Sequence, residues 1–173
     1  MKKILIVIAA FILLGISIKA DADYNVIIPS ASLRLRVIPN SNNPSDQMIK
    51  EQVKTSIQTE ISNLLVDAKT VDESIDILEN NIDIIDQKLA KFLNSHNLDY
   101  EIKLGSNYFP RKVYKGVLYE EGYYDSLVII IGDGEGDNWW CVLFPPLCLL
   151  EVKEDVTDVE YQLFITNIIN YFK

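Results

Sequence analysis

At 173 residues the chain has the length of a single domain, and its 49% hydrophobic side chains are enough to build a core. Its 25 acidic and 16 basic side chains give a net charge of −9, which is the wrong sign for a protein that neutralises nucleic-acid phosphates. The same charge argues against electrostatic binding to an anionic membrane surface.

The N-terminal segment has the three parts of an export signal. Met1-Lys2-Lys3 is positively charged, Ile4 to Ile18 is apolar, and Ala20-Asp21-Ala22 is a small-x-small cleavage pattern. The apolar run is shorter than the ~20 residues that span a bilayer comfortably. We therefore predict a signal peptide over residues 1–22, with an uncleaved anchor as the alternative. No cysteine follows the apolar run, so we expect no lipid attachment there.

Residues 23–30 are expected to be a polar lead-in, and residues 31–173 the folded domain. The domain opens with a predicted strand of period two and one polar face, formed by Leu33, Arg34, Leu35, Arg36, Val37 and Ile38. Asn43 then caps a predicted helix with Pro44 at its first position. One apolar stripe runs along this helix to about Val66: Ile49, Val53, Ile57, Ile61, Leu64 and Leu65.

A second helix is predicted to begin at the capping box that runs from Thr70 to Glu73. Its apolar residues recur at spacings of three and four: Ile75, Leu78, Ile82, Ile85, Leu89 and Phe92. Two adjacent amphipathic helices with a short link predict a helical hairpin that packs on a sheet. Dimerisation through this stripe is the alternative, but the stripe is short for a coiled coil.

The second half of the chain predicts four strands, Tyr100–Lys103 with its neighbours, Val113–Tyr119, Asp125–Ile131 and Trp139–Phe144. The third is apolar on both faces and should be central. The glycine-rich residues 132–138 should be a flexible hairpin connection. A C-terminal helix is predicted from Val159, Leu163, Ile165, Ile168, Ile169 and Phe172. The fold class is therefore α+β, one domain in which the helical hairpin packs on a mainly antiparallel sheet, with a C-terminal helix.

The run DNWWCVLFPPLC, from Asp137 to Cys148, is the most apolar and aromatic part of this region. It predicts a strand that turns sharply at Pro145-Pro146, which would bring Cys141 near Cys148. A disulfide suits an exported protein, whereas the alternative is two buried thiols that pack as small apolar groups. The bland interpretation of the whole run is a core strand with a tight corner.

Few residues suggest catalysis or metal binding. His96, the single histidine, is expected to contact a helix C-terminus. Asp133, Glu135 and Asp137 alternate with glycines like the start of a calcium loop, but they lack the distant glutamate, so a solvated connection is favoured. Arg34 and Arg36 are expected by default to pair with local carboxylates, or else to mark a recognition surface. We predict no catalytic residue, metal or cofactor.

Several stretches together resemble the stage II sporulation protein R family. They are LRLRVIPNSNNPSDQMIKEQVK (Leu33 to Lys54), FPRKVYKG (Phe109 to Gly116), GYYDSLVIIIGDGEGDNWW (Gly122 to Trp140) and CVLFPPLC (Cys141 to Cys148). The most specific part is NWWCVLFPPLC, and the resemblance extends from about Ala31 to Glu151.

The resemblance implies an exported signal made in the forespore rather than an enzyme. Such a protein crosses into the space between the forespore and mother-cell membranes. There it activates a membrane-embedded aspartic protease that matures the sporulation sigma factor E precursor. No nucleic acid and no small-molecule substrate is expected. An exported carboxylate-dependent cell-wall hydrolase and a calcium-dependent binding module are the alternatives.

The predicted contact surface for the protease is the aromatic hairpin and corner, because rigid aromatic side chains make good binding hot spots. Burial of the same residues in the core is the competing interpretation. The predicted contact residues are Asn138, Trp139, Trp140, Phe144, Pro145, Pro146, Arg34 and Arg36.

Overall fold

A computed structural model describes residues 26–148 and 157–172, so the predicted signal peptide lies outside the described residues. The elements follow the chain in this order: β1 (Val26–Ile27), β2 (Leu33–Ile38), α2 (Pro44–Leu64), α3 (Val71–Asn80), α4 (Ile82–Leu93), η1 (Asn94–His96), β3 (Tyr100–Phe109), β4 (Lys112–Tyr114), β5 (Val117–Tyr119), β6 (Gly122–Ile131), β7 (Trp139–Phe144) and α5 (Asp158–Tyr171).

The main sheet has the strand order β3-β6-β2-β7, and a smaller sheet has the order β1-β5-β4. In the main sheet β6 runs parallel to β2, while the β3–β6 and β2–β7 pairs are antiparallel. The apolar strand predicted to be central is therefore one of the two inner strands. The α+β fold class is confirmed, and each sheet is mixed because it contains one parallel pair.

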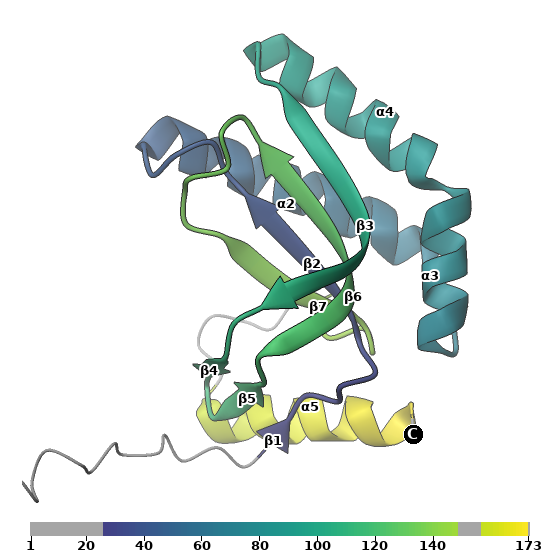
Figure 1. Ribbon diagram of the computed structural model, residues 1–173. Coiled ribbons are helices and arrows are strands. Elements are labelled where there is room, and N and C mark those ends of the chain that lie inside the picture. The colour runs from purple at the N-terminus through teal and green to yellow at the C-terminus, as the bar shows by residue number, and fades with distance from the viewer. Residues whose placement is uncertain (1–25, 149–156, 173) are drawn as a thin grey trace, which may run out of the picture.

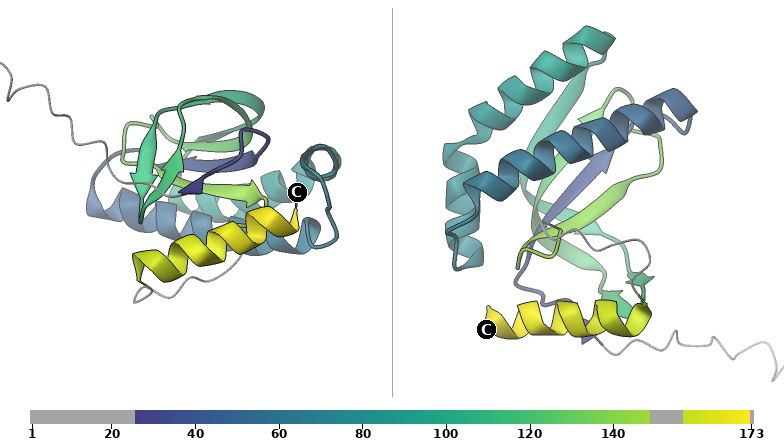
Figure 2. Two further views of the ribbon diagram at one scale, coloured as in Figure 1. Left: turned by 90° about the horizontal axis from the view of Figure 1, so that it is seen from below. Right: turned by 180° about the vertical axis from the view of Figure 1, so that it is seen from behind.

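The helices α2, α3 and α4 cover one face of the main sheet, as seen from behind in Figure 2. Leu35 and Val37 of β2 meet Ile57 and Ile61 of α2 in the main core, and all four are fully buried. The apolar stripe of α2 thus faces the sheet as predicted. Figure 1 shows the opposite face of the sheet turned toward the viewer, with α2 behind it.

The predicted second helix is divided in two, so that prediction was wrong in one respect. At Asn81 the backbone leaves the helix (φ −123°, ψ 15°), and α3 ends while α4 begins. The Asn81 side-chain amide donates to the carbonyl of Ile77 at 2.8 Å, the acceptor that the backbone N–H of a continuing helix would use. The apolar stripe survives the break, since Leu78, Ile85 and Leu89 are all buried.

The predicted hairpin over residues 132–138 is also wrong, because β2 lies between β6 and β7. The connection instead crosses the end of β2 and is fastened to the loop that follows it. Glu135 N–H donates to Asn40 O and Gly136 N–H to Pro39 O, both at 3.1 Å. The side-chain oxygens of Asn40 and Asn42 accept from the backbone N–H groups of Asp133 and Asp137.

The small sheet differs from two of the sequence predictions. The predicted strand Val113–Tyr119 is a hairpin of β4 and β5 that turns at Lys115 and Gly116, both with positive φ. Part of the predicted polar lead-in forms β1, which pairs with β5, and Ile28 is only 1% exposed. A second core lies between this sheet and α5, formed by Ile28, Val117, Val142, Leu147, Tyr161, Ile165 and Ile169.

We expect Gly136→Ala to destabilise the fold because the connection and the β2–α2 loop are in close contact there. A Cβ at this position would collide with the carbonyl oxygen of Ser41 and lie 2.6 Å from Cγ of Pro39. The free energy of unfolding, measured by urea denaturation, should fall by about 1–3 kcal/mol. Glu135→Ala, at the exposed neighbouring residue, should change it by less than about 0.5 kcal/mol. Equal stability of the two variants would contradict this packing.

Asp46 should make the same loop sensitive to acid. Its carboxylate accepts from Ser41 Oγ at 2.6 Å and Asn40 Nδ2 at 2.9 Å, and these bonds hold its pKa below the ordinary value of 3.8. The folded state therefore binds this proton less readily than the unfolded chain. The stability that Asp46 contributes is present above about pH 4 and is lost as the pH falls through the lowered pKa.

Urea midpoints measured from pH 7 to pH 2.5 should show this dependence directly. Asp46→Asn should be less stable than the wild type at neutral pH and should lose less stability on acidification. Asp133→Asn, at an exposed carboxylate in the adjoining connection, is the matched control and should follow the wild-type curve. Parallel curves for the wild type and Asp46→Asn would rule out this role.

Candidate functional site

The best candidate for a binding site lies on the face of the main sheet that α2 does not cover. Alternation along β2 sends Leu33, Leu35 and Val37 toward the helices and the two arginines to the other side. In the sheet register, Arg36 lies opposite Trp140 of β7. We call Arg34, Arg36, Lys112, Asn138 and Trp140 the Arg–Trp cluster.

Trp140 is the centre of the cluster. Its partly exposed indole lies 5.7 Å from the Arg36 guanidinium and 5.2 Å from Lys112 Nζ, measured to the ring centroid. Both distances are within the range of cation–π attraction. Phe109 packs edge-on against the same indole, with centroids 5.7 Å apart. The aromatic surface thus holds two cations on one side of the sheet.

Asn138 fixes the direction of the Arg36 side chain. With the amide oriented so that both of its ends are satisfied, its oxygen accepts from Arg36 Nε at 3.0 Å and Nη2 at 2.6 Å. Its nitrogen donates to Gly136 O at 3.0 Å. Arg36 is therefore held by a neutral amide, and burial lowers its pKa. Asn138 in turn is positioned by the glycine-rich connection.

Arg34 is a buried cation, with only 2% of its surface exposed. Its guanidinium lies 3.3 Å from the centroid of the Tyr124 ring and 5.3 Å from that of Phe109. Nε donates to Ser32 Oγ at 3.4 Å, whereas Nη2 finds no acceptor. Burial lowers the pKa of Arg34, and Tyr124 opposes this shift.

The default expectation that the two arginines pair with local carboxylates is wrong for the described part of the chain. Ion pairs there join Lys50, Lys54, Lys88 and Lys103 to glutamates, and none includes Arg34, Arg36 or Lys112. A buried charge without a counter-ion lowers stability unless other interactions compensate. The cluster therefore combines positive charge with unused hydrogen-bonding capacity.

The other predicted contact residues lie in different surroundings. Trp139 faces α2, where Lys54 Nζ is 5.1 Å from its ring, and it packs partly buried against the main core. Phe144 and Pro145 are buried, and the Phe144 ring packs against Phe172 of the last described turn. Pro146 is partly exposed. The structure thus brings Asn138, Trp140, Arg34 and Arg36 together and separates them from the proline corner.

The cysteine pair closes that corner. Cys141 and Cys148 form a disulfide, with Cα atoms 5.5 Å apart, and the Phe144–Pro145 peptide bond within the loop that it closes is cis.

Three residues around the Arg–Trp cluster were missed by sequence reasoning: Lys112, Phe109 and Tyr124. All three lie outside the aromatic run, although Phe109 and Lys112 are part of the FPRKVYKG stretch and Tyr124 is part of the Gly122–Trp140 stretch that resemble the family.

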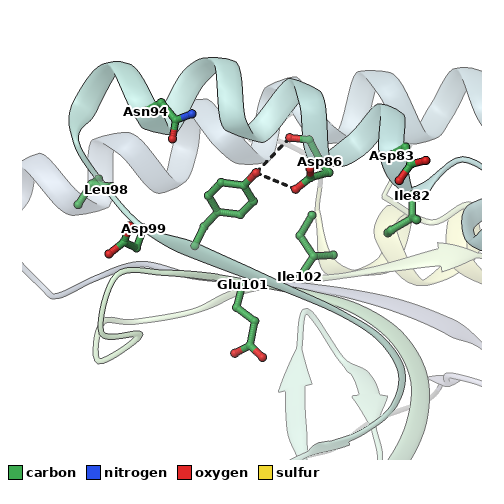
Figure 3. Close-up of a pocket in the computed structure, with 9 residues that line it drawn as sticks. Ile82, Asp83, Asp86, Asn94, Leu98, Asp99, Glu101 and Ile102 are labelled. Carbon is green, nitrogen blue, oxygen red and sulfur yellow. Dashed lines mark hydrogen bonds between the residues drawn. The ribbon is translucent and has the colours of Figure 1, made fainter.

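A second candidate is the groove between α4 and β3, with a volume of about 720 Å³. The Tyr100 hydroxyl of β3 donates to Oδ1 of Asp86, on α4, at 2.7 Å, and Figure 3 shows Asp86 on the helix above the strand. Burial and Asp86 raise the pKa of Tyr100 to about 12. Glu101 points away on the other side of β3, while Asp83, Asp86 and Asp99 are exposed to water.

These carboxyls are poorly placed for glycoside hydrolysis, which needs one protonated carboxyl in an apolar site. His96 is the last residue of η1, which follows α4, and its Nδ1 lies 2.9 Å from the carbonyl oxygen of Phe92, which confirms the predicted helix C-terminal contact. Within the described ranges, no three His, Cys, Asp or Glu side chains are grouped closely enough to hold a metal ion. No helix in those ranges is long and apolar enough to span a bilayer.

Comparisons with known proteins agree on one family. A sequence model of stage II sporulation protein R matches residues 29–154, a range that includes the whole Arg–Trp cluster. Stage II sporulation protein R of Bacillus subtilis (strain 168) is 31% identical over 128 residues. The aligned region covers 73% of this chain and 57% of that relative, so the chain spans little more than half of the relative's length. No solved structure matches.

The lone buried charge of Arg34 leads to a stability prediction. Arg34→Met fills a similar volume without an unpaired donor, so the free energy of unfolding should stay within about 1 kcal/mol of the wild type. Arg34→Ala leaves a cavity between Phe109 and Tyr124 and should lose about 2–4 kcal/mol. Urea denaturation of the three proteins measures both effects. If Met costs as much as Ala, the guanidinium itself stabilises the fold.

Proposed function

The chain belongs to the stage II sporulation protein R family, and from this membership we propose that it is a signalling protein of sporulation that acts by binding. It is exported from the forespore into the space between the forespore and mother-cell membranes. There it activates a membrane-embedded aspartic protease, which then matures the sporulation sigma factor E precursor. It transforms no molecule itself.

The observation that carries this proposal is the Arg–Trp cluster. Arginine and tryptophan are the residues most enriched in binding hot spots, and here both are presented on one sheet face. A sheet face of paired strands is rigid, so little conformational entropy is lost when a partner binds to it. The exposed carboxyls of the α4–β3 groove lack the enclosed surroundings that acid catalysis needs, which favours binding over hydrolysis.

Activation by binding requires a difference in affinity. The protein must bind the active conformation of the protease more tightly than its resting conformation, because equal affinity for both shifts nothing. Moving the protease from 1% to 99% active takes a preference of about 10⁴-fold. The cluster supplies two kinds of contact for such a preference, charge and aromatic surface.

Deletion of the gene should block maturation of the sigma factor E precursor. We expect the uncleaved precursor to persist on immunoblots during sporulation and the wild-type gene to restore cleavage. Purified protein incubated with peptidoglycan should release no soluble fragments. Normal precursor processing in the deletion strain would contradict the proposal, and fragment release would favour the hydrolase alternative.

A further inference from the structure

We propose that the Arg–Trp cluster binds an acidic, extended segment of the protein partner, with carboxylates seated on Arg36 and Lys112 beside Trp140. This inference rests on the proposed function, since it specifies the chemistry of the partner's contact segment. It concerns a surface that has positive charge in a protein whose net charge is −9.

The first support is the missing counter-charge. Four lysines, on α2, α4 and β3, have glutamate partners at 2.6 to 3.6 Å. The cations of the cluster have none among the described residues, although the chain is rich in carboxylates. Arg36 and Lys112 instead lie on the same indole, which attracts cations without neutralising them. The neutralising charge is therefore expected to come from another molecule.

The second support is hydrogen-bonding capacity that the described residues leave unused. Asn138 accepts from Nε and Nη2 of Arg36, and Nη1 takes no part in these two hydrogen bonds. Nε1 of Trp140 and Nη2 of Arg34 also lack partners, but both atoms are buried, so the ligand's contacts fall on Arg36 and Lys112. A carboxylate supplies several acceptor positions in a small volume, and an arginine binds it through a fork of parallel N–H groups.

The buried charge of Arg34 strengthens the attraction without contact. The Phe109 ring lies 5.3 Å from the Arg34 guanidinium and 5.7 Å from the Trp140 ring, so Arg34 is one ring away from the indole. A charge surrounded by apolar rings is screened less than one in water. Arg34 therefore raises the positive potential at a surface that a ligand reaches through Arg36 and Lys112.

The arrangement favours an extended protein segment over an anionic membrane. Arg36 and Lys112 flank one ring, at 5.7 and 5.2 Å from the Trp140 centroid. Side chains on the same face of an extended segment are about 6.6–6.8 Å apart, so two such carboxylates can each reach one of these cations. Membrane binding needs several exposed basic residues, each worth about 1 kcal/mol, in a protein that the lipid charge does not otherwise repel. Here the accessible cations are few and the rest of the chain is acidic.

Peptide binding tests this chemistry. The probes are overlapping twelve-residue peptides that tile the extracytoplasmic segments of the protease, labelled with fluorescein and titrated with the purified exported protein. We expect binding by peptides that carry at least two Asp or Glu residues, and loss of binding when these are replaced by Asn or Gln. The double variant Arg36→Gln/Lys112→Gln should bind about tenfold more weakly.

Control variants distinguish a loss of binding caused by missing charge from one caused by misfolding. In the double variant a glutamine at position 36 can still donate to Asn138, and its thermal unfolding should stay close to that of the wild type. Lys69→Gln removes one positive charge from the exposed loop between α2 and α3 and should leave binding unchanged. Vesicles of phosphatidylcholine and phosphatidylglycerol in a 3:1 ratio test the membrane alternative with the same proteins.

Cells then distinguish this inference from the proposed function. In the deletion strain, wild-type and Lys69→Gln genes should restore precursor cleavage, and the double variant should not. Restoration by the double variant would overturn the inference while leaving the signalling function intact. So would binding confined to uncharged peptides, or vesicle binding that the double variant loses. Normal cleavage in the deletion strain itself would instead contradict the proposed function.

Discussion

The insertion of β2 between β6 and β7 is the constraint on which the rest of the structure depends. A six-residue strand from the start of the domain pairs on one side with residues 126–130 and on the other with residues 139–144. These pairings close long loops, so the sheet forms only when distant parts of the chain meet. The hydrogen bonds from the 132–138 connection to Pro39, Asn40 and Asn42 then hold the end of β2 in place.

That insertion also creates the Arg–Trp cluster. A central strand is flanked by a paired strand at each edge, so the backbone positions of its polar residues are fixed. The helix-facing residues of β2 build the main core, and the same strand aims Arg34 and Arg36 at the other face. Retaining a buried arginine without a carboxylate lowers the stability that an apolar residue would give.

The segment between β6 and β7 contributes both to the fold and to the Arg–Trp cluster. It crosses β2 without pairing as a hairpin, and its glycines allow close approach to the β2–α2 loop. The same connection ends at Asn138, whose amide orients Arg36. Its exposed acidic side chains therefore belong to a structural crossing, and its backbone supports the Arg–Trp cluster.

The sequence by itself determined the helices and strands that local residue patterns specify. Period-two spacing located β2, helical spacing located α2, and the apolar run before the proline pair located β7. Apolarity on both faces identified β6 as an inner strand. Capping residues marked the start of α3, and the residue motifs pointed to the family. Only the tertiary structure decided the strand order, the break at Asn81, and which aromatic residues meet the arginines. Pairing between strands distant in sequence brings Phe109 and Tyr124 next to Arg34, and Lys112 next to Trp140. Local periodicity does not specify contacts of this kind.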